Sequence, residues 1–239
     1  MIKNKDLRCQ KIETFKQRKN QKGFFNLKLS LKNRLCRKCR YPSDSEIFYR
    51  ALKNGKFKYN NVLQCNKLDK IIISDASTLI LLEKIALLDK LAGNFEFIIP
   101  QEVYNEAVAK GKEAKSEDAY SIENKINGGV IKVMKIKDRK KANQIIGEFN
   151  LEKGETESIV LFLQEKADIL AIDDHKAINV CKIYKIPFIT ALTFVITVLD
   201  AKIIMKSEAR EMVRNLGIYG RYKDELIYKA LNYIGAEKL

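Results

Sequence analysis

The stretch KIIISDASTLILLEKIALLDKLAG (residues 70–93) joins a short apolar run to a longer segment of periodic apolar residues, with an aspartate between them. The run KIIIS (70–74) is short and rich in isoleucine, which is typical of a strand buried on both faces. The apolar spacing after it predicts a helix over 77–92, and Gly93 follows where glycine commonly ends a helix. A buried strand that leads directly into a helix is the unit from which parallel α/β sheets are built.

The same strand-and-helix unit recurs along the rest of the chain. Further strands are predicted at 95–100, 129–136, 168–172 and 186–189. Further helices are predicted at 101–111, 115–127, 138–149, 151–166, 175–184, 191–203, 207–215 and 223–234. Because short Val/Ile/Leu-rich strands alternate with helices, we expect an α/β domain with a mainly parallel sheet that is covered on both faces.

Positive charge is concentrated at the N-terminus. The chain of 239 residues has a formal net charge of +15, and residues 1–69 hold 19 Lys and Arg against 5 Asp and Glu. This shift in composition predicts a boundary near Leu68, between a basic, cysteine-containing extension (1–69) and a domain formed by 70–239. We weigh two compatible interpretations of the extension: a basic arm of the kind common at chain termini, and a tether that binds nucleic acid by neutralising phosphates.

Hydropathy argues against a membrane or secreted protein. No apolar run approaches the length needed to span a bilayer, and residues 1–30 are too charged for a secretory signal. We therefore predict a soluble, cytoplasmic protein that does not act at a membrane.

The five cysteines, an odd number, favour reduced thiols or metal ligands over a disulfide framework. Cys36 and Cys39 have the two-residue spacing of a zinc site, and Cys9 and Cys65 would complete a set of four thiolate ligands for a structural Zn²⁺. The alternative is that these four are free thiols in a basic arm. Cys181 lies in an apolar helical stretch and is predicted to be a core residue.

Acidic residues follow the predicted strands at the points where ligands gather in parallel sheets. Four segments carry them: Asp75 after the first strand, Glu106 in the helix after the second, Glu155 and Glu157 in the first turn of a later helix, and Asp173 and Asp174 after the strand 168–172. Each acid alone has an ordinary alternative, as a helix cap, a first-turn residue or an exposed helical residue. Together, acids that four segments deliver to one edge of a sheet favour a site.

A cluster of carboxylates repels itself unless a cation is bound. The single histidine, His175, opens a predicted helix and is interpreted as a helix-start residue, so the candidate ligands are all oxygens. Oxygen ligands select Mg²⁺ or Mn²⁺, which suit phosphate chemistry because they activate water and stabilise a leaving oxygen. The pattern therefore predicts a metal-dependent nuclease.

Four segments, in this order, resemble the PIN-domain family: IIISDASTLILLEKI (71–85), IIPQEVYNEA (98–107), GETESIVLF (154–162) and LAIDDHKAINV (170–180). Within that family, the chain is similar to predicted nucleic-acid-binding proteins related to the VapC-type toxin ribonucleases. The resemblance covers residues 70–239. It implies a PIN-like three-layer α/β/α fold and a metal-dependent ribonuclease activity that leaves a 3′ hydroxyl.

The resemblance also implies roles for single residues. The catalytic acids that it implies are Asp75, Glu106, Glu155 and Asp174. The metal ligands that it implies are Asp75, Asp173, Asp174 and Glu155. Glu157 is a rival of Glu155, and Asp173 is a neighbour of Asp174 that would either ligate or orient the metal. Ile172 stands where the family usually has a threonine, so a hydroxyl expected to support the site is missing.

The same resemblance implies binding partners, and the alternatives to a nuclease belong to a different class of function. The resemblance implies RNA as the substrate, a homodimer and, if the chain is the toxin of a toxin–antitoxin pair, an antitoxin protein. The main alternative is a catalytically inert PIN-like module that binds nucleic acid or protein. A further alternative is that the predicted helix in SDSEIFYRALKNGKF (43–57) is an antitoxin-like segment that regulates the nuclease fused to it.

Overall fold

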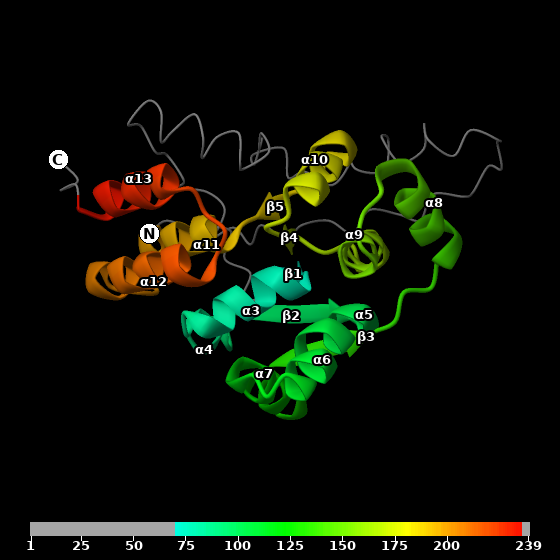
Figure 1. Cartoon of the computed structure of the whole chain (residues 1–239), viewed down its shortest axis with the longest axis horizontal. Coiled ribbons are helices and arrows are strands. Elements are labelled where there is room, and N and C mark those ends of the chain that lie inside the picture. The colour runs from blue at the N-terminus through cyan, green and yellow to red at the C-terminus, as the bar shows by residue number, and fades with distance from the viewer. Residues whose placement is uncertain (1–69, 236–239) are drawn as a thin grey trace, which may run out of the picture. The chain divides into compact units, whose positions relative to one another are not determined.

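The computed structural model describes residues 70–235 (Figure 1), so the extension 1–69 with its predicted helix 43–57 lies outside the described residues. The strands are β1 (Lys70–Ser74), β2 (Phe95–Pro100), β3 (Ile131–Met134), β4 (Ile169–Ala171) and β5 (Phe188–Ile189). The helices before β4 are α3 (Ala76–Lys84), α4 (Leu87–Leu91), α5 (Gln101–Tyr104), the π-helical turn η1 (Asn105–Ala109), α6 (Lys110–Glu113), α7 (Glu117–Asn127), α8 (Arg139–Phe149) and α9 (Lys153–Glu165). The helices after β4 are α10 (His175–Tyr184), α11 (Ala191–Asp200), α12 (Lys206–Tyr219) and α13 (Asp224–Gly235). Across residues 70–235, no helix has the length and apolarity to cross a bilayer.

The strands form one parallel sheet. Their order is β3-β2-β1-β4-β5, with β1 at the centre between β2 and β4. The register aligns Ile72 of β1 with Phe97 on one side and with Ile169 on the other. Parallel neighbours put all their carboxyl ends at the same edge of the sheet, which is the property that the predicted site requires.

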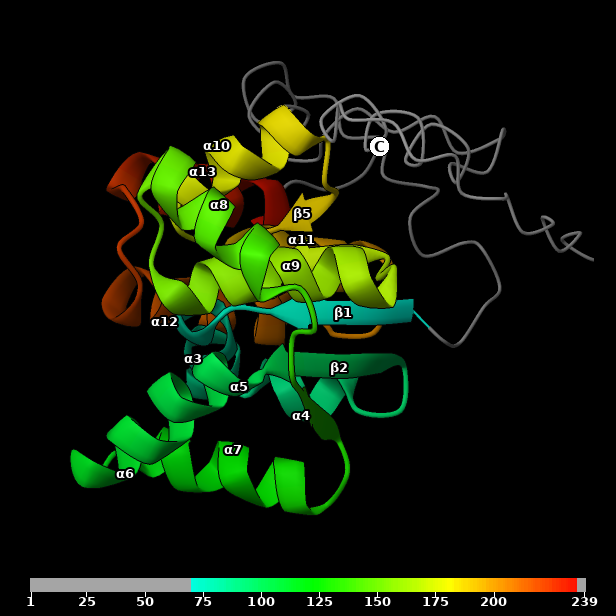
Figure 2. The same cartoon turned by 90° about the vertical axis from the view of Figure 1, so that its right-hand side faces the viewer.

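Helices cover both faces of the sheet (Figures 1 and 2). Because neighbouring residues of a strand point to opposite faces, Ile72 packs into one core and Ile73 into the other. The first core gathers side chains of α3, α4, α7, α11, α12 and α13, and the second gathers side chains of α8, α9 and α10. Cys181 of α10 is fully buried in the second core, as predicted. The predicted three-layer α/β/α fold with a mainly parallel sheet is confirmed.

One predicted helix is two helices in the structure. α3 ends at Lys84 and α4 begins at Leu87, because Ala86 between them takes a left-handed conformation with φ 54°. A single residue in that region interrupts the helical hydrogen bonds and is sterically unfavourable for any side chain with a Cβ. The prediction of one helix over 77–92 is therefore wrong, since apolar spacing does not report the backbone conformation of one residue.

We expect Ala86→Gly to raise the free energy of unfolding by about 1 kcal/mol, because glycine adopts the left-handed backbone without steric cost. The matched control is Ala109→Gly, an exposed alanine with helical φ −62° and ψ −55°. There the same exchange should lower the free energy of unfolding by about 1 kcal/mol. Denaturant unfolding measures both changes, and two changes of the same sign would contradict this explanation of the break.

Candidate active site

The strand order reverses next to β1. From β1 the sheet extends through β2 to β3, and the chain then returns to the other side of β1 to form β4 and β5. Open α/β sheets bind ligands beyond the carboxyl ends of the two strands where the order reverses, which are β1 and β4 here. These two ends are tied together, because the Asp75 N–H donates a hydrogen bond to the Ala171 carbonyl at 3.0 Å.

Asp75 directly follows β1 and caps α3. One of its carboxylate oxygens accepts a hydrogen bond from the Thr78 N–H and the other from the Ser77 hydroxyl, each at 2.8 Å. The residue is only 2% exposed. Burial is the main cause that raises the pKa of Asp75 to about 7; the charge of Asp173 adds to the shift, and the hydrogen bonds oppose it. Asp75 is therefore a helix cap and also a buried carboxylate beside other acids.

Glu155 lies in the first turn of α9. Its Oε2 accepts a hydrogen bond from the Glu152 N–H at 3.2 Å, while Oε1 accepts none from the described residues. Burial raises the pKa of Glu155 to about 7, and the negative charges of Asp174 and Asp75 add to that shift. The structure thus brings Glu155 into the electrostatic field of the acids that follow β1 and β4.

Asp174 caps α10, because one of its carboxylate oxygens accepts a hydrogen bond from the Ala177 N–H at 2.9 Å. Its other oxygen accepts no hydrogen bond from any residue within 70–235. His175 is the exposed first residue of α10, and its Nδ1 lies 3.3 Å from the Asn179 amide nitrogen. This placement agrees with the interpretation of His175 as a helix-start residue.

Asp173 is held by three donors. Its Oδ2 accepts hydrogen bonds from the Thr78 hydroxyl at 2.9 Å and from the Ala191 N–H at 3.0 Å, and its Oδ1 accepts one from the Tyr222 hydroxyl. Burial raises the pKa of Asp173, and these hydrogen bonds oppose the shift. The sequence patterns do not single out Tyr222, because it lies between two helices and 49 residues from Asp173.

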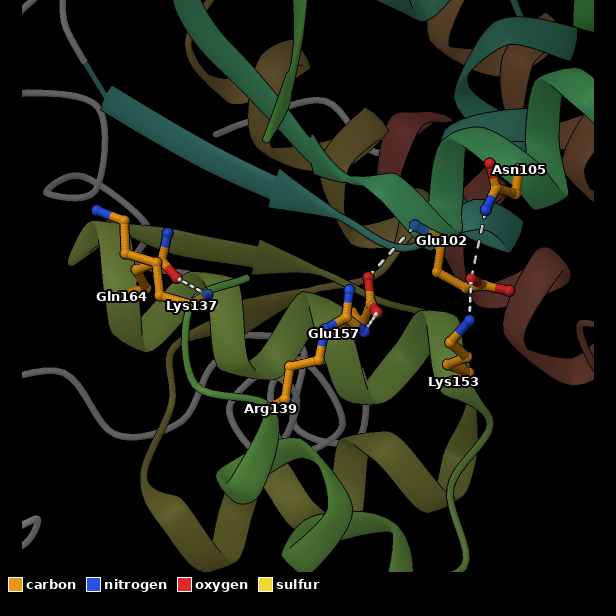
Figure 3. A network of polar contacts seen from close by, with 7 residues as sticks. All are labelled: Glu102, Asn105, Lys137, Arg139, Lys153, Glu157 and Gln164. Atoms are coloured by element: carbon orange, nitrogen blue, oxygen red, sulfur yellow. Dashed lines mark hydrogen bonds and ion pairs between the residues drawn. The ribbon is translucent and has the colours of Figure 1, made fainter. Parts of the chain in front are cut away.

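Glu157 of α9 makes its contacts with α5 and α8 (Figure 3). Its carboxylate accepts a hydrogen bond from the Glu102 N–H at 3.3 Å and lies 3.6 Å from the Arg139 guanidinium. Lys153 pairs with the Glu102 side chain in the same network. Glu157 thus joins α9 to α5 and α8. Of the two candidate acids in α9, Glu155 is the one whose pKa is raised by the charges of Asp174 and Asp75.

Glu106 reaches the first turn of α9 from the helix after β2. It lies in η1, within the continuous helical segment 101–113, and such π-helical turns are frequent at functional sites. Its carboxylate packs so closely on Gly154 that a Cβ at that position would lie 2.9 Å from the Glu106 Cδ. Burial raises the pKa of Glu106, and the charge of Lys110 opposes the shift. A Cβ at position 154 would therefore displace the end of the Glu106 side chain.

The donors at this edge of the sheet suit a hard divalent cation. As the side chains lie, no three His, Cys, Asp or Glu residues within 70–235 are close enough together to hold one ion. Even so, Asp75, Asp174 and Glu155 offer only carboxylate oxygens, and two of them have a pKa raised to about 7. A divalent cation would lower both pKa values, so the residues fit Mg²⁺ or Mn²⁺ in chemistry. The predicted zinc ligands lie outside the described residues: Cys9, Cys36, Cys39 and Cys65.

A comparison with protein-family models agrees with the PIN-domain resemblance seen in the sequence. The family model DUF3368, a PIN domain, matches residues 71–235. Among solved structures, the crystal structure of PAE2754 from Pyrobaculum aerophilum matches with a TM-score of 0.40 and 15% identity, over 56% of this chain and 98% of that one. A comparison with curated proteins finds no match.

The metal-free protein should lose stability as the pH rises from about 4 to about 7. Asp75 and Glu155 have pKa values near 7 in the folded chain and lower values when unfolded, so the folded state holds more protons in this interval. Asp75→Asn removes one of the two charges. In EDTA we expect this variant to melt a few degrees above wild type at about pH 8 and to match wild type at about pH 4.

The control for this pH effect is Glu211→Gln, which removes an exposed carboxylate on α12. Its melting temperature should follow that of wild type at both pH values, because this carboxylate is exposed to water in the folded chain as well as in the unfolded one. If the melting temperatures of wild type and Asp75→Asn change in parallel with pH, the buried charge of Asp75 does not destabilise the folded protein.

Proposed function

Because the chain belongs to the PIN-domain family, whose members are generally metal-dependent nucleases, we propose that it is a metal-dependent ribonuclease. One observation carries the proposal: Asp75, Asp174 and Glu155 come from separate segments and share one electrostatic field where the strand order reverses. Buried carboxylates that repel each other in this way are costly unless they bind a cation. Phosphodiester hydrolysis uses such a cation, because negative charge develops on the leaving oxygen.

Each acid has a role in the proposed reaction. Asp75, Asp174 and Glu155 hold Mg²⁺ or Mn²⁺ through carboxylate oxygens. When bound, the cation supplies an activated water and stabilises charge on the leaving oxygen. Glu106 orients the attacking water and accepts its proton at a carboxylate oxygen, because a raised pKa makes it a stronger base than an ordinary glutamate.

We predict that Asp75→Asn and Glu155→Gln each lower the rate of RNA cleavage by about a hundredfold or more, because each removes a charge that holds the cation. The assay uses purified full-length protein and a mixed pool of structured and single-stranded RNA, with Mg²⁺, Mn²⁺ or EDTA. Glu157→Gln is the matched control. It lies two residues from Glu155 and binds Glu102 and Arg139 instead, so it should keep most of the activity.

The second candidate is a catalytically inert module that binds nucleic acid. This candidate is favoured by the finding that, within residues 70–235, no three potential ligands are gathered closely enough to hold an ion. If wild type, Asp75→Asn and Glu155→Gln bind RNA but none cleaves it with either metal, the ribonuclease proposal fails and the binding module takes its place.

RNA binding should depend on the basic extension. Residues 1–69 hold 19 Lys and Arg, and each phosphate that they neutralise adds about 0.7 to the slope of log affinity against log salt for single strands. We therefore expect the chain without residues 1–69 to bind RNA more weakly, with a salt slope smaller by at least about 2. An unchanged slope with raised cleavage would instead indicate that the extension inhibits the nuclease.

The family resemblance extends the proposal to partners. A homodimer is expected by analogy, and the chain would be the toxin of a toxin–antitoxin pair if a small antitoxin protein binds and inhibits it. Size-exclusion chromatography with light scattering tests the first point. Growth arrest on expression of wild type, but not of Asp75→Asn, tests the second.

A further inference from the structure

Tyr222 joins the C-terminal helices to the loop that carries Asp174. It lies between α12 and α13, and its hydroxyl donates a hydrogen bond to Oδ1 of Asp173. The same hydroxyl accepts a hydrogen bond from the Leu192 N–H at 3.2 Å, in the first turn of α11. Both hydrogen-bonding functions of the Tyr222 hydroxyl are therefore used, and its ring packs against the first core.

Asp173 is the centre of this network. In addition to Tyr222, its carboxylate accepts hydrogen bonds from the Thr78 hydroxyl of α3 and from the Ala191 N–H of α11. The Asp173 side chain thus joins three residues that lie 95, 18 and 49 positions from it in the sequence: Thr78, Ala191 and Tyr222. A buried polar network whose members are all satisfied favours one arrangement of the groups that it joins.

The network is directly connected to two proposed cation ligands, Asp174 and Asp75. Asp173 precedes Asp174 in the loop between β4 and α10, and Thr78 also donates its backbone N–H to the Asp75 carboxylate at 2.8 Å. A shift of the Asp173 side chain would therefore move both Asp174 and the cap of α3. Asp173 itself has an oxygen shared by two donors and another held by Tyr222, which leaves it poorly placed to bind a cation as well.

We propose that Tyr222 is a positioning residue, which acts through Asp173 to fix the loop between β4 and α10 so that Asp174 and Asp75 face the same cation. This inference rests on the proposed function, because it assumes that these two acids bind Mg²⁺ or Mn²⁺. In Tyr222→Phe the ring still fills its place in the core, but Oδ1 of Asp173 loses its donor. The Asp173 carboxylate then keeps only the two donors at Oδ2, so the loop is held less tightly.

The competing interpretation predicts the opposite sign. If Asp173 binds the cation directly, Tyr222 competes with the cation for Oδ1, and its removal should leave the affinity unchanged or raise it. If Tyr222 positions the loop, its removal should lower the affinity for Mn²⁺ about tenfold or more, as is typical for groups that orient a metal ligand. Direct measurement of Mn²⁺ binding therefore separates the two.

The matched control is Tyr233→Phe. Tyr233 of α13 donates a hydrogen bond to the Asp200 carboxylate at 2.8 Å, so this variant also removes a bond between a tyrosine and an aspartate in the C-terminal helices. Asp200 ends α11, nine residues after Ala191 and about 13 Å away along the helix axis. Loss of that bond should leave the Mn²⁺ affinity within about twofold of wild type, because it does not touch the loop.

The experiment titrates Mn²⁺ into wild-type, Tyr222→Phe and Tyr233→Phe full-length protein by electron paramagnetic resonance. It also follows hydrogen exchange of the Ala177 amide, which is bound to Asp174. Weaker Mn²⁺ binding and faster exchange in Tyr222→Phe, with Tyr233→Phe like wild type, are the expected results. Unchanged or tighter binding in Tyr222→Phe overturns the inference, and so does an equal loss in both variants, which would mean general loosening.

Failure of the proposed function gives a different result. If wild type binds no Mn²⁺ and cleaves no RNA, the metal-dependent ribonuclease is wrong, and hydrogen exchange alone decides the role of Tyr222. Faster exchange at Ala177 in Tyr222→Phe only would still show that Tyr222 fixes the loop, and equal exchange in all three proteins would overturn that role.

Discussion

The parallel pairing of β1 with β4 is the interaction on which the rest of the site depends. It places Asp75 and the pair Asp173 and Asp174 at the same edge of the sheet, and the hydrogen bond from the Asp75 N–H to the Ala171 carbonyl closes the pairing at its end. The cost is the burial of carboxylates, which raises the pKa of both Asp75 and Asp173, and for Asp75 the charge of Asp173 adds to the shift. Hydrogen bonds from Ser77, Thr78 and Tyr222 offset part of that cost.

The parallel fold and the edge that gathers the acids were predictable because burial on both faces leaves a simple pattern. A central strand such as β1 must be apolar on both sides, so Ile72 and Ile73 enter opposite cores and the strand appears as an unbroken apolar run. Once the strands are parallel, the residue after each strand lies at the carboxyl edge. The positions of Asp75 and Asp174 follow from that rule without any knowledge of the loops.

The remaining features depend on information that apolar spacing does not contain. Glu155 and Glu157 are two residues apart, which turns them about 200° around a helix, so their roles depend on which face of α9 meets the sheet edge. The π-helical turn at Glu106 changes the direction of a side chain without changing the pattern of apolar residues. Tyr222 acts on Asp173 across 49 residues, and only the packing of the C-terminal helices brings the two together.

The acids in and around α9 differ in whether they have a cationic partner. Lys153 lowers the pKa of Glu102 by hydrogen bonding to it, and Arg139 lies beside Glu157, so on that side of the helix each acid has a cationic partner. Glu155 has no ion pair among the described residues, and its pKa is raised to about 7 by burial and by other acids. Lys153, two residues from Glu155, pairs with Glu102 on the other side of the helix. Asp75 and Asp174, at the ends of β1 and β4, have no ion pair within residues 70–235 either, so a bound cation would supply the positive charge that lysine and arginine supply to Glu102 and Glu157.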